Sequence, residues 1–347
     1  MANRSRSPRA WIIAGALLSA GLLALLLSRT SIDRIGAAVA GAHPGLLALY
    51  PPLVLLTLAL RAYRFGMLVG FERIGFWPLV LVTQIRNVCV DLLPARLGNA
   101  AYLYLLPARY GVPLELGISS LASTILFDLF SVMPILAAAA ALLLVTRAVP
   151  PELLLTVQLA GASALLAGLL MGALLLWYPR WAKALAGWTA RRRSGAAGLR
   201  ARLLAILERS LRDMAELRER GLALRLLGLS LALRIGKFAC LVTIMLAVAA
   251  PYLRPSGWAA VGVCWVTVLL GEVTLTLPLP TVAHLGTLEL GLSLGLTTLG
   301  GLSVGPAASV TLGVRILSTA LQFAVGAACL PLLGAGNTSR GSRRGAL

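Results

Sequence analysis

Apolar stretches of about twenty residues recur along almost the whole chain, and they constrain its fold more than any other feature. One of the longest, residues 116–146, contains a single charged residue, Asp128. Such a helix is long enough to cross the roughly 30 Å hydrocarbon core of a bilayer. Only 12% of the residues are charged and the mean hydropathy is +0.89, whereas soluble domains carry about 25% charged residues. We therefore predict an all-α polytopic membrane protein, because a membrane barrel would show short alternating segments instead.

The order of the apolar runs predicts six full crossings and two interrupted segments. The interrupted segments, 78–107 and 256–300, contain proline and glycine and are expected to enter and leave the membrane on the same side. Basic residues concentrate before the first run, in the loop at 178–221 and in the tail, so these parts, and with them both termini, should face the cytoplasm. We expect the crossings at 10–28, 45–66, 116–146, 152–177, 222–249 and 306–333.

The same order predicts an inverted repeat. A crossing, a re-entrant hairpin and a crossing occupy 45–146, and the pattern returns with opposite orientation at 222–333. The breaks "LLPARLGN" and "LPTVAHLGTLE" each place a proline a few residues before Leu-Gly. Inverted repeats with broken helices are typical of transporters. We expect one integral membrane domain, residues 1–340, with an amphipathic surface helix in the loop at 178–221 and a tail at 341–347.

The stretch "NVCVDLLPARLGNAAYLYLLP", residues 87–107, carries charge, glycine and proline deep in an apolar chain. Such a break at membrane depth persists only where it is buried in protein or lines a wet cavity, and ionisable residues there are functional by default. Backbone N–H groups freed by Pro94 and Gly98, together with Arg96, predict an anion site, with His284 and Glu289 on the opposite wall. The predicted cavity residues are Asn87, Asp91, Pro94, Arg96, Gly98, Asn99, Asp128, Arg234, Lys237, His284, Gly286, Glu289 and Arg315.

The role of several charged residues in the predicted membrane segments can be interpreted in two ways. Arg61 and Arg64 lie three residues apart near the end of their span, and they either extend to lipid phosphates or face the cavity. Asp128 and Arg315 either form internal charge pairs or line the cavity. A lone histidine such as His284 is more often a hydrogen-bonded structural residue than a proton carrier.

Other sites and ligands are not expected. Cysteines occur singly and the two histidines lie far apart, so neither a metal site nor a cofactor is predicted. No Walker A motif or catalytic constellation is present. The net charge of +19 lies mainly in segments between apolar runs, which indicates loops facing anionic lipid rather than a nucleic-acid partner.

At these residues the sequence resembles the flippase-like membrane domain of the lysylphosphatidylglycerol synthase family, which also forms the N-terminal part of the multiple peptide resistance factor. Its elements occur here in order over nearly the whole chain. They are "RAYRF" from Arg61, Asn87 with "LLPARLGN", "TILFD" ending at Asp128, "PTVAHLGTLE" ending at Glu289, and Arg315.

The chain also departs from this family pattern. Asn99 stands where the pattern has a glutamate and Tyr102 where it has an arginine, while Thr124 and Ile125 replace a Glu-Arg pair. We interpret these as charge pairs removed as units, since that avoids a buried unpaired charge. Functional residues are carried over at four matching positions, which are Arg96, Asp128, Glu289 and Arg315.

The resemblance implies a stand-alone lipid translocase of the bacterial cytoplasmic membrane rather than an enzyme, because the soluble aminoacyl-transferase domain of the full synthase is expected to be absent. Its partners would be membrane lipids with an anionic or phosphate-bearing head group, and a homo-oligomer is left open. One alternative is an enzyme or subunit of envelope glycolipid synthesis acting on a polyprenyl-phosphate sugar. Another is a non-transporting scaffold that docks a partner through the loop at 178–221.

Overall fold

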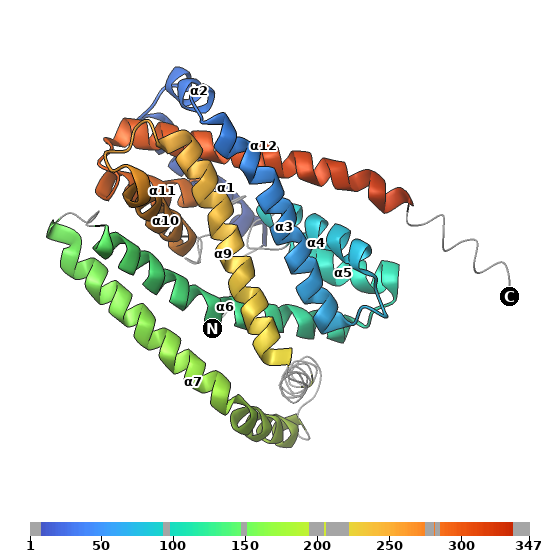
Figure 1. The fold of residues 1–347 in the computed structure, drawn as a ribbon. Helices are drawn as coiled ribbons and strands as arrows, with labels where there is room; N and C mark the ends of the chain where they lie inside the picture. Colours follow the sequence, from blue (N-terminus) through green and yellow to red (C-terminus); the bar gives the residue numbers. More distant parts are fainter. Residues whose placement is uncertain are drawn as a thin grey trace, which may run out of the picture.

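Every regular element that the structure describes is helical (Figure 1), which confirms the predicted all-α polytopic class. The computed structural model describes residues 8–92, 98–146, 151–193, 205, 222–274, 281 and 285–335. In chain order the helices are α1 (Pro8–Leu27), α2 (Ile32–Ala40), α3 (Pro44–Val69), α4 (Phe76–Leu92), α5 (Asn99–Tyr110), α6 (Leu114–Val145), the 3-10 turn η2 (Pro151–Leu153), α7 (Leu154–Arg193), α9 (Leu222–Ala249), α10 (Gly257–Thr274), α11 (Thr287–Thr298) and α12 (Val304–Ala335).

Within the described residues, six helical segments are long and apolar enough to cross a membrane. Five of them, in α3, α6, α7, α9 and α12, coincide with predicted crossings. The sixth is α10, which the sequence places in the interrupted segment 256–300. Its 18 residues span about 27 Å, because an α-helix rises 1.5 Å per residue. The first predicted crossing corresponds to α1, whose part from Leu17 to Leu27 is a shorter apolar helix.

Both interrupted segments consist of two helices that pack on each other. The first pair is α4 and α5, and the second is α10 and α11. The chain between the helices of each pair lies wholly or largely outside the described residues, at 93–97 and 275–284. The two pairs occupy opposite sides of the molecule, with α3 and α9 crossing side by side between them (Figure 1). Helix α4 also contacts α12, and α10 contacts α6. The opposite orientation of the two halves stays a prediction.

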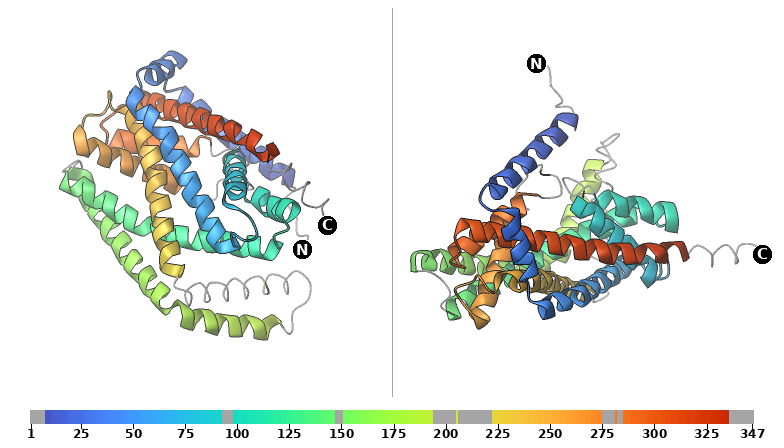
Figure 2. Two further views of the ribbon diagram at one scale, coloured as in Figure 1. Left: turned by 45° about the vertical axis from the view of Figure 1, so that its right-hand side comes forward. Right: turned by 90° about the horizontal axis from the view of Figure 1, so that it is seen from above.

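Two hydrophobic clusters hold the two halves. One joins α3, α4 and α5 through buried residues such as Phe65, Leu79 and Tyr102. The other is centred on α9 to α12 and includes Met245 and Leu296. Helix α7 packs along α6 at the edge of the molecule (Figure 2) and exposes many leucines, as a surface facing lipid would.

Two elements differ from the sequence analysis. No helix is expected between 28 and 45, yet α2 forms there, with the Ser31 hydroxyl accepting a hydrogen bond from the backbone N–H of Arg34. Its buried residues Ile35 and Ala38 face α12, and this packing stabilises a helix of only nine residues. Helix α7 continues to Arg193, well past the predicted end of its crossing. The predicted amphipathic helix later in that loop lies outside the described residues.

Gly286, just before α11, supports a first prediction. Its φ of +88° disfavours any side chain, and an added Cβ would lie 2.3 Å from the Cβ of Leu22 on α1. We expect Gly286→Ala to destabilise the protein by about 2–4 kcal/mol, from backbone strain and overpacking together. The measurement is the thermal unfolding midpoint of detergent-purified protein. In a Leu22→Gly background the clashing Cβ is absent and only the backbone strain remains, so equal losses in the two backgrounds would contradict the contact.

Candidate functional site

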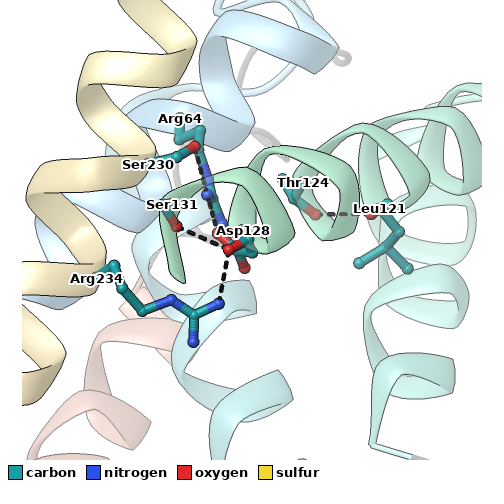
Figure 3. A network of polar contacts seen from close by, with 7 residues as sticks. All are labelled: Arg64, Leu121, Thr124, Asp128, Ser131, Ser230 and Arg234. Carbon is teal, nitrogen blue, oxygen red and sulfur yellow. Dashed lines mark hydrogen bonds and ion pairs between the residues drawn. The ribbon is translucent and has the colours of Figure 1, made fainter. Parts of the chain in front are cut away.

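The most connected polar group is an ion pair between α3 and α6 (Figure 3). The Arg64 guanidinium donates to both carboxylate oxygens of Asp128, with Nη1 to Oδ1 at 2.5 Å and Nη2 to Oδ2 at 3.4 Å. The same Nη1 donates to the hydroxyl of Ser230 on α9 at 2.8 Å. Arg64 is only 3% exposed, so its charge depends on these partners rather than on water. The pair therefore ties three helices together.

A second arginine approaches the same position from α9. Nη2 of Arg234, one turn after Ser230, donates to the backbone carbonyl of Asp128 at 3.0 Å (Figure 3). The Ser131 hydroxyl donates to that carbonyl as well, at 2.8 Å. Within the described part of the chain, Arg234 has no carboxylate at ion-pair distance. Among the described residues, its charge is balanced by the dipole of that carbonyl and by the field of nearby Asp128.

The Asp128 side chain is 39% exposed although it lies near the middle of α6, a 32-residue apolar helix. A carboxylate facing hydrocarbon at that depth is costly. The space beside it is therefore expected to contain water or a polar ligand, because polar groups at membrane depth persist only where protein or a wet space receives them.

Two further arginines lie beside this pair. Arg61, one turn before Arg64 on α3, donates to the side-chain oxygen of Asn87 on α4 at 2.7 Å. Arg86 on α4 donates through Nε to the side-chain oxygen of Asn99, the first residue of α5, at 2.9 Å. Its guanidinium carbon lies 5.8 Å from the centre of the Phe65 ring, a cation–π distance. Arg86 therefore connects the two sides of the first helix break.

We name Arg61, Arg64, Arg86 and Arg234 the arginine cluster. Asp128 interacts electrostatically with all four members. It is the one described carboxylate among them, and it pairs with Arg64. Arg86 and Arg234 bond only neutral groups among the described residues. The cluster is therefore strongly cationic, and such a site attracts anions.

A separate polar group begins α11. Glu289 is 0% exposed, and its Oε2 accepts a hydrogen bond from the backbone N–H of Gly286 at 2.7 Å. Its Oε1 lies 3.4 Å from Nε of Arg315 on α12. A carboxylate at a helix N-terminus satisfies a free backbone donor and interacts favourably with the helix dipole. Glu289 therefore fixes the start of α11 and holds it to α12.

A third group is the ion pair between α9 and α10. Nζ of Lys237 donates to Oε2 of Glu272 at 2.6 Å, and both side chains are partly exposed. Ser230, Arg234 and Lys237 share one face of α9, since they lie at i, i+4 and i+7. Lys237 is one of the predicted cavity residues, and its pairing with Glu272 is not evident from the sequence.

Comparison with known proteins identifies the family. Residues 12–326 match the family described as "Lysylphosphatidylglycerol synthase TM region", which is nearly the whole chain. The chain belongs to this family. It is also 30% identical over 129 residues to a protein named Glycosyltransferase AglD from Haloferax volcanii. That similarity covers 36% of this chain and 20% of the relative, so the chain spans only a small part of that protein's length.

Membership of the lysylphosphatidylglycerol synthase membrane-region family confirms the resemblance, and the structure shows where the predicted residues lie. Four predicted residues lie at the arginine cluster. Asn87 accepts a hydrogen bond from Arg61, Asn99 accepts one from Arg86, and the Asp128 carbonyl accepts one from Arg234. Gly286, Glu289 and Arg315 form the group at α11. Gly98 is buried where α5 begins. The side chain of Asp91, and the residues Pro94, Arg96 and His284, lie outside the described part of the chain.

The contacts of Arg64, Asp128 and Arg315 bear on the two open interpretations of membrane charges. Arg64 is buried in an ion pair, so it does not extend to lipid phosphates. Asp128 and Arg315 each form an internal charge pair, and a cavity role for them stays a prediction. Sequence reasoning missed Ser230 and Ser131, which complete the contacts of Arg64 and of the Asp128 carbonyl. The i, i+4 spacing of Ser230 and Arg234 is the signal that points to Ser230.

The structure shows what two of the residues that depart from the family pattern contact. Asn99 contacts Arg86, a base that is still present, whereas the Tyr102 hydroxyl lies 2.9 Å from the hydroxyl of Ser120. The interpretation that acid and base were removed together stays a prediction. At position 99 the amide leaves a guanidinium with a neutral partner.

Proposed function

We propose that this protein is a lipid translocase. The polar head group of a phospholipid or glycolipid would pass along the arginine cluster while its acyl chains remain in the bilayer. The observation that carries the proposal is the accessible Asp128 carboxylate in the middle of an apolar span, surrounded by arginines from three helices. Placing ionisable side chains at membrane depth costs free energy, and such residues usually have a functional role.

The chemistry of the cluster favours an anionic or phosphate-bearing head group. Guanidinium groups match the oxygens of phosphate in a planar fork and are less strongly hydrated than ammonium groups. Access would alternate if the unit α3 to α6 rocks against the unit α9 to α12, as in transporters built from inverted repeats. The proposal includes the bacterial cytoplasmic membrane as location, with both termini in the cytoplasm.

The test is a translocation assay in liposomes. Purified protein is reconstituted with lipids carrying a fluorescent head group, and a membrane-impermeant quencher then reports the fraction in the outer leaflet. We expect quenching above the roughly one half accessible in protein-free liposomes, and about a tenfold slower translocation in Arg234→Gln, equivalent to about 1.4 kcal/mol in the barrier. The matched control is Arg225→Gln, since Arg225 lies on the same helix but is exposed. Quenching equal to that of empty liposomes for every head group would contradict the proposal.

A second candidate is a part in envelope glycolipid synthesis, and the similarity to Glycosyltransferase AglD favours it. In that case the cluster would hold the phosphate of a polyprenyl-phosphate sugar during sugar transfer. Incubating the protein with a polyprenyl-phosphate sugar labelled in its sugar, and with an acceptor lipid, distinguishes the two, because transfer would move the label to the acceptor and release polyprenyl phosphate. Labelled acceptor formed in detergent solution, where no leaflets exist, would favour the enzyme.

A further inference from the structure

We propose that the arginine cluster selects lipids whose head group ends in a phosphomonoester, and that Asn99 determines this selectivity by leaving Arg86 without a carboxylate partner. The inference deepens the proposed function, since it names the charge state of the head group bound at the same site. It makes Asn99 a specificity-determining residue.

The first step is the charge balance. Among the described residues, Asp128 pairs with Arg64, whereas Arg86 and Arg234 bond only neutral groups, which leaves two guanidinium charges without a carboxylate partner. Because burial makes uncompensated charge expensive, two such guanidinium groups favour a bound anion with more than one charge.

The second step is the free bonding capacity of two arginines. Arg86 uses Nε for Asn99, and the Phe65 ring lies beside its guanidinium. Among the described residues its terminal nitrogens have no hydrogen-bond or ion-pair partner. Arg234 has a single bond, from Nη2 to the backbone carbonyl of Asp128. Both side chains are partly accessible rather than fully buried. Each therefore retains donors for a ligand.

The third step is the match to a ligand class. A phosphomonoester carries about two negative charges at neutral pH and has three strong acceptor oxygens. A phosphodiester carries one charge and two such oxygens, so it uses fewer of the available donors. A head group with an ammonium ion would enter a field that is already positive, which disfavours it. The terminal phosphomonoester therefore fits the cluster best.

The fourth step is the role of Asn99. Its side-chain oxygen accepts the Arg86 Nε hydrogen bond without neutralising the charge. A glutamate there would form an ion pair with Arg86, neutralise one of the two guanidinium charges that have no carboxylate partner and occupy the guanidinium donors. Asn99→Glu is thus expected to reduce the preference for the dianion, whereas Asn99→Gln preserves a neutral acceptor.

The experiment measures binding rather than translocation. The affinities of full-length detergent-purified protein for short-chain phosphatidic acid, the matching phosphatidylglycerol and glycerol 3-phosphate are measured by thermophoresis. We expect phosphatidic acid to bind about tenfold more tightly than phosphatidylglycerol, and Asn99→Glu to remove that ratio, a change of about 1.4 kcal/mol. Asn99→Gln and Arg225→Gln should keep the ratio. Arg86→Gln should lose it too, which tests the idea if Asn99→Glu does not fold.

Each other outcome is decisive. Equal affinity for the two lipids would overturn the selectivity. An unchanged ratio in both Asn99→Glu and Arg86→Gln would overturn the role of this pair. Binding of glycerol 3-phosphate as tight as that of phosphatidic acid would overturn recognition of a lipid in favour of a soluble phosphate ester. If phosphatidic acid binds more tightly than phosphatidylglycerol but no lipid is translocated in liposomes, only the proposed function is contradicted. If lipids are translocated but the two bind equally, only this inference is contradicted.

Discussion

Asp128→Asn is expected to destabilise the protein by about 3 kcal/mol, the lower end for breaking a buried ion pair, since the carboxylate is partly accessible. The substitution leaves Arg64, 3% exposed, with neutral hydrogen-bond acceptors in place of a carboxylate among the described residues, and with three other arginines nearby. The thermal unfolding midpoint in detergent measures the loss. The control is Glu152→Gln, the same acid-to-amide change at an exposed carboxylate, where we expect almost none.

A double-mutant cycle separates this pair from its surroundings. Arg64→Leu combined with Asp128→Leu removes both charges, so most of the stability should return, because a buried pair replaced by apolar residues is often neutral. Translocation should nevertheless be lost, since the Asp128 carboxylate and its pair with Arg64 on α3 are gone, although the backbone carbonyl still accepts from Arg234 on α9. If the double variant is as unstable as Asp128→Asn with Arg64 intact, the ion pair is not the reason for the loss.

Gly98→Ala is expected to have an effect of similar size for a steric reason. An added Cβ would lie 2.0 Å from the backbone nitrogen of Val90 and 2.3 Å from the carbonyl carbon of Cys89. Backbone atoms cannot rotate away, so α4 and α5 must separate. We expect a loss on the order of 3 kcal/mol, together with the Arg86–Asn99 contact across the break.

The measurement for Gly98→Ala is the yield of monodisperse protein in size-exclusion chromatography, followed by the unfolding midpoint. Gly228→Ala is a matched control, because Gly228 lies within α9 and its added Cβ would meet nothing within 4 Å. There the better helix propensity of alanine should stabilise the protein by up to about 1 kcal/mol. A Gly98→Ala protein as stable as the unmodified chain would show that the two backbones are not so close.

The membrane class and most crossings follow from the sequence because hydrocarbon imposes a length and a polarity on each span. The role of α10 is harder to predict from the sequence, since its 18 residues are long enough for a short crossing and also suit one arm of a hairpin. Helix α2 forms through contact with α12, which no local pattern reveals. Likewise, the long apolar runs locate α6, but they do not indicate which side of it faces protein.

The site was predictable in its components and not in its pairings. A break with charge in an apolar region indicates a polar site, and Asn99, Asp128 and Arg234 do lie around one cluster. The environment of Arg64 could not be predicted, because its ion-pair partner Asp128 follows 64 residues later in the sequence. Spacing along α9 is enough to predict that Ser230 and Arg234 share one face. The contact of Arg86 with Asn99 could not be predicted in this way, because it depends on how α4 and α5 pack across the break.

The contact of Leu22 with Gly286 has a practical consequence for attaching labels. Helix α1 precedes both helix-break-helix units, yet it touches the turn from which α11 begins and so lies next to the residue that Glu289 caps. A reporter domain fused ahead of α1 that shifted this helix would disturb the Glu289–Arg315 contact without touching the arginine cluster. A fusion after α12 avoids that route, and comparing the two fusions would show how strongly the second break depends on the first helix.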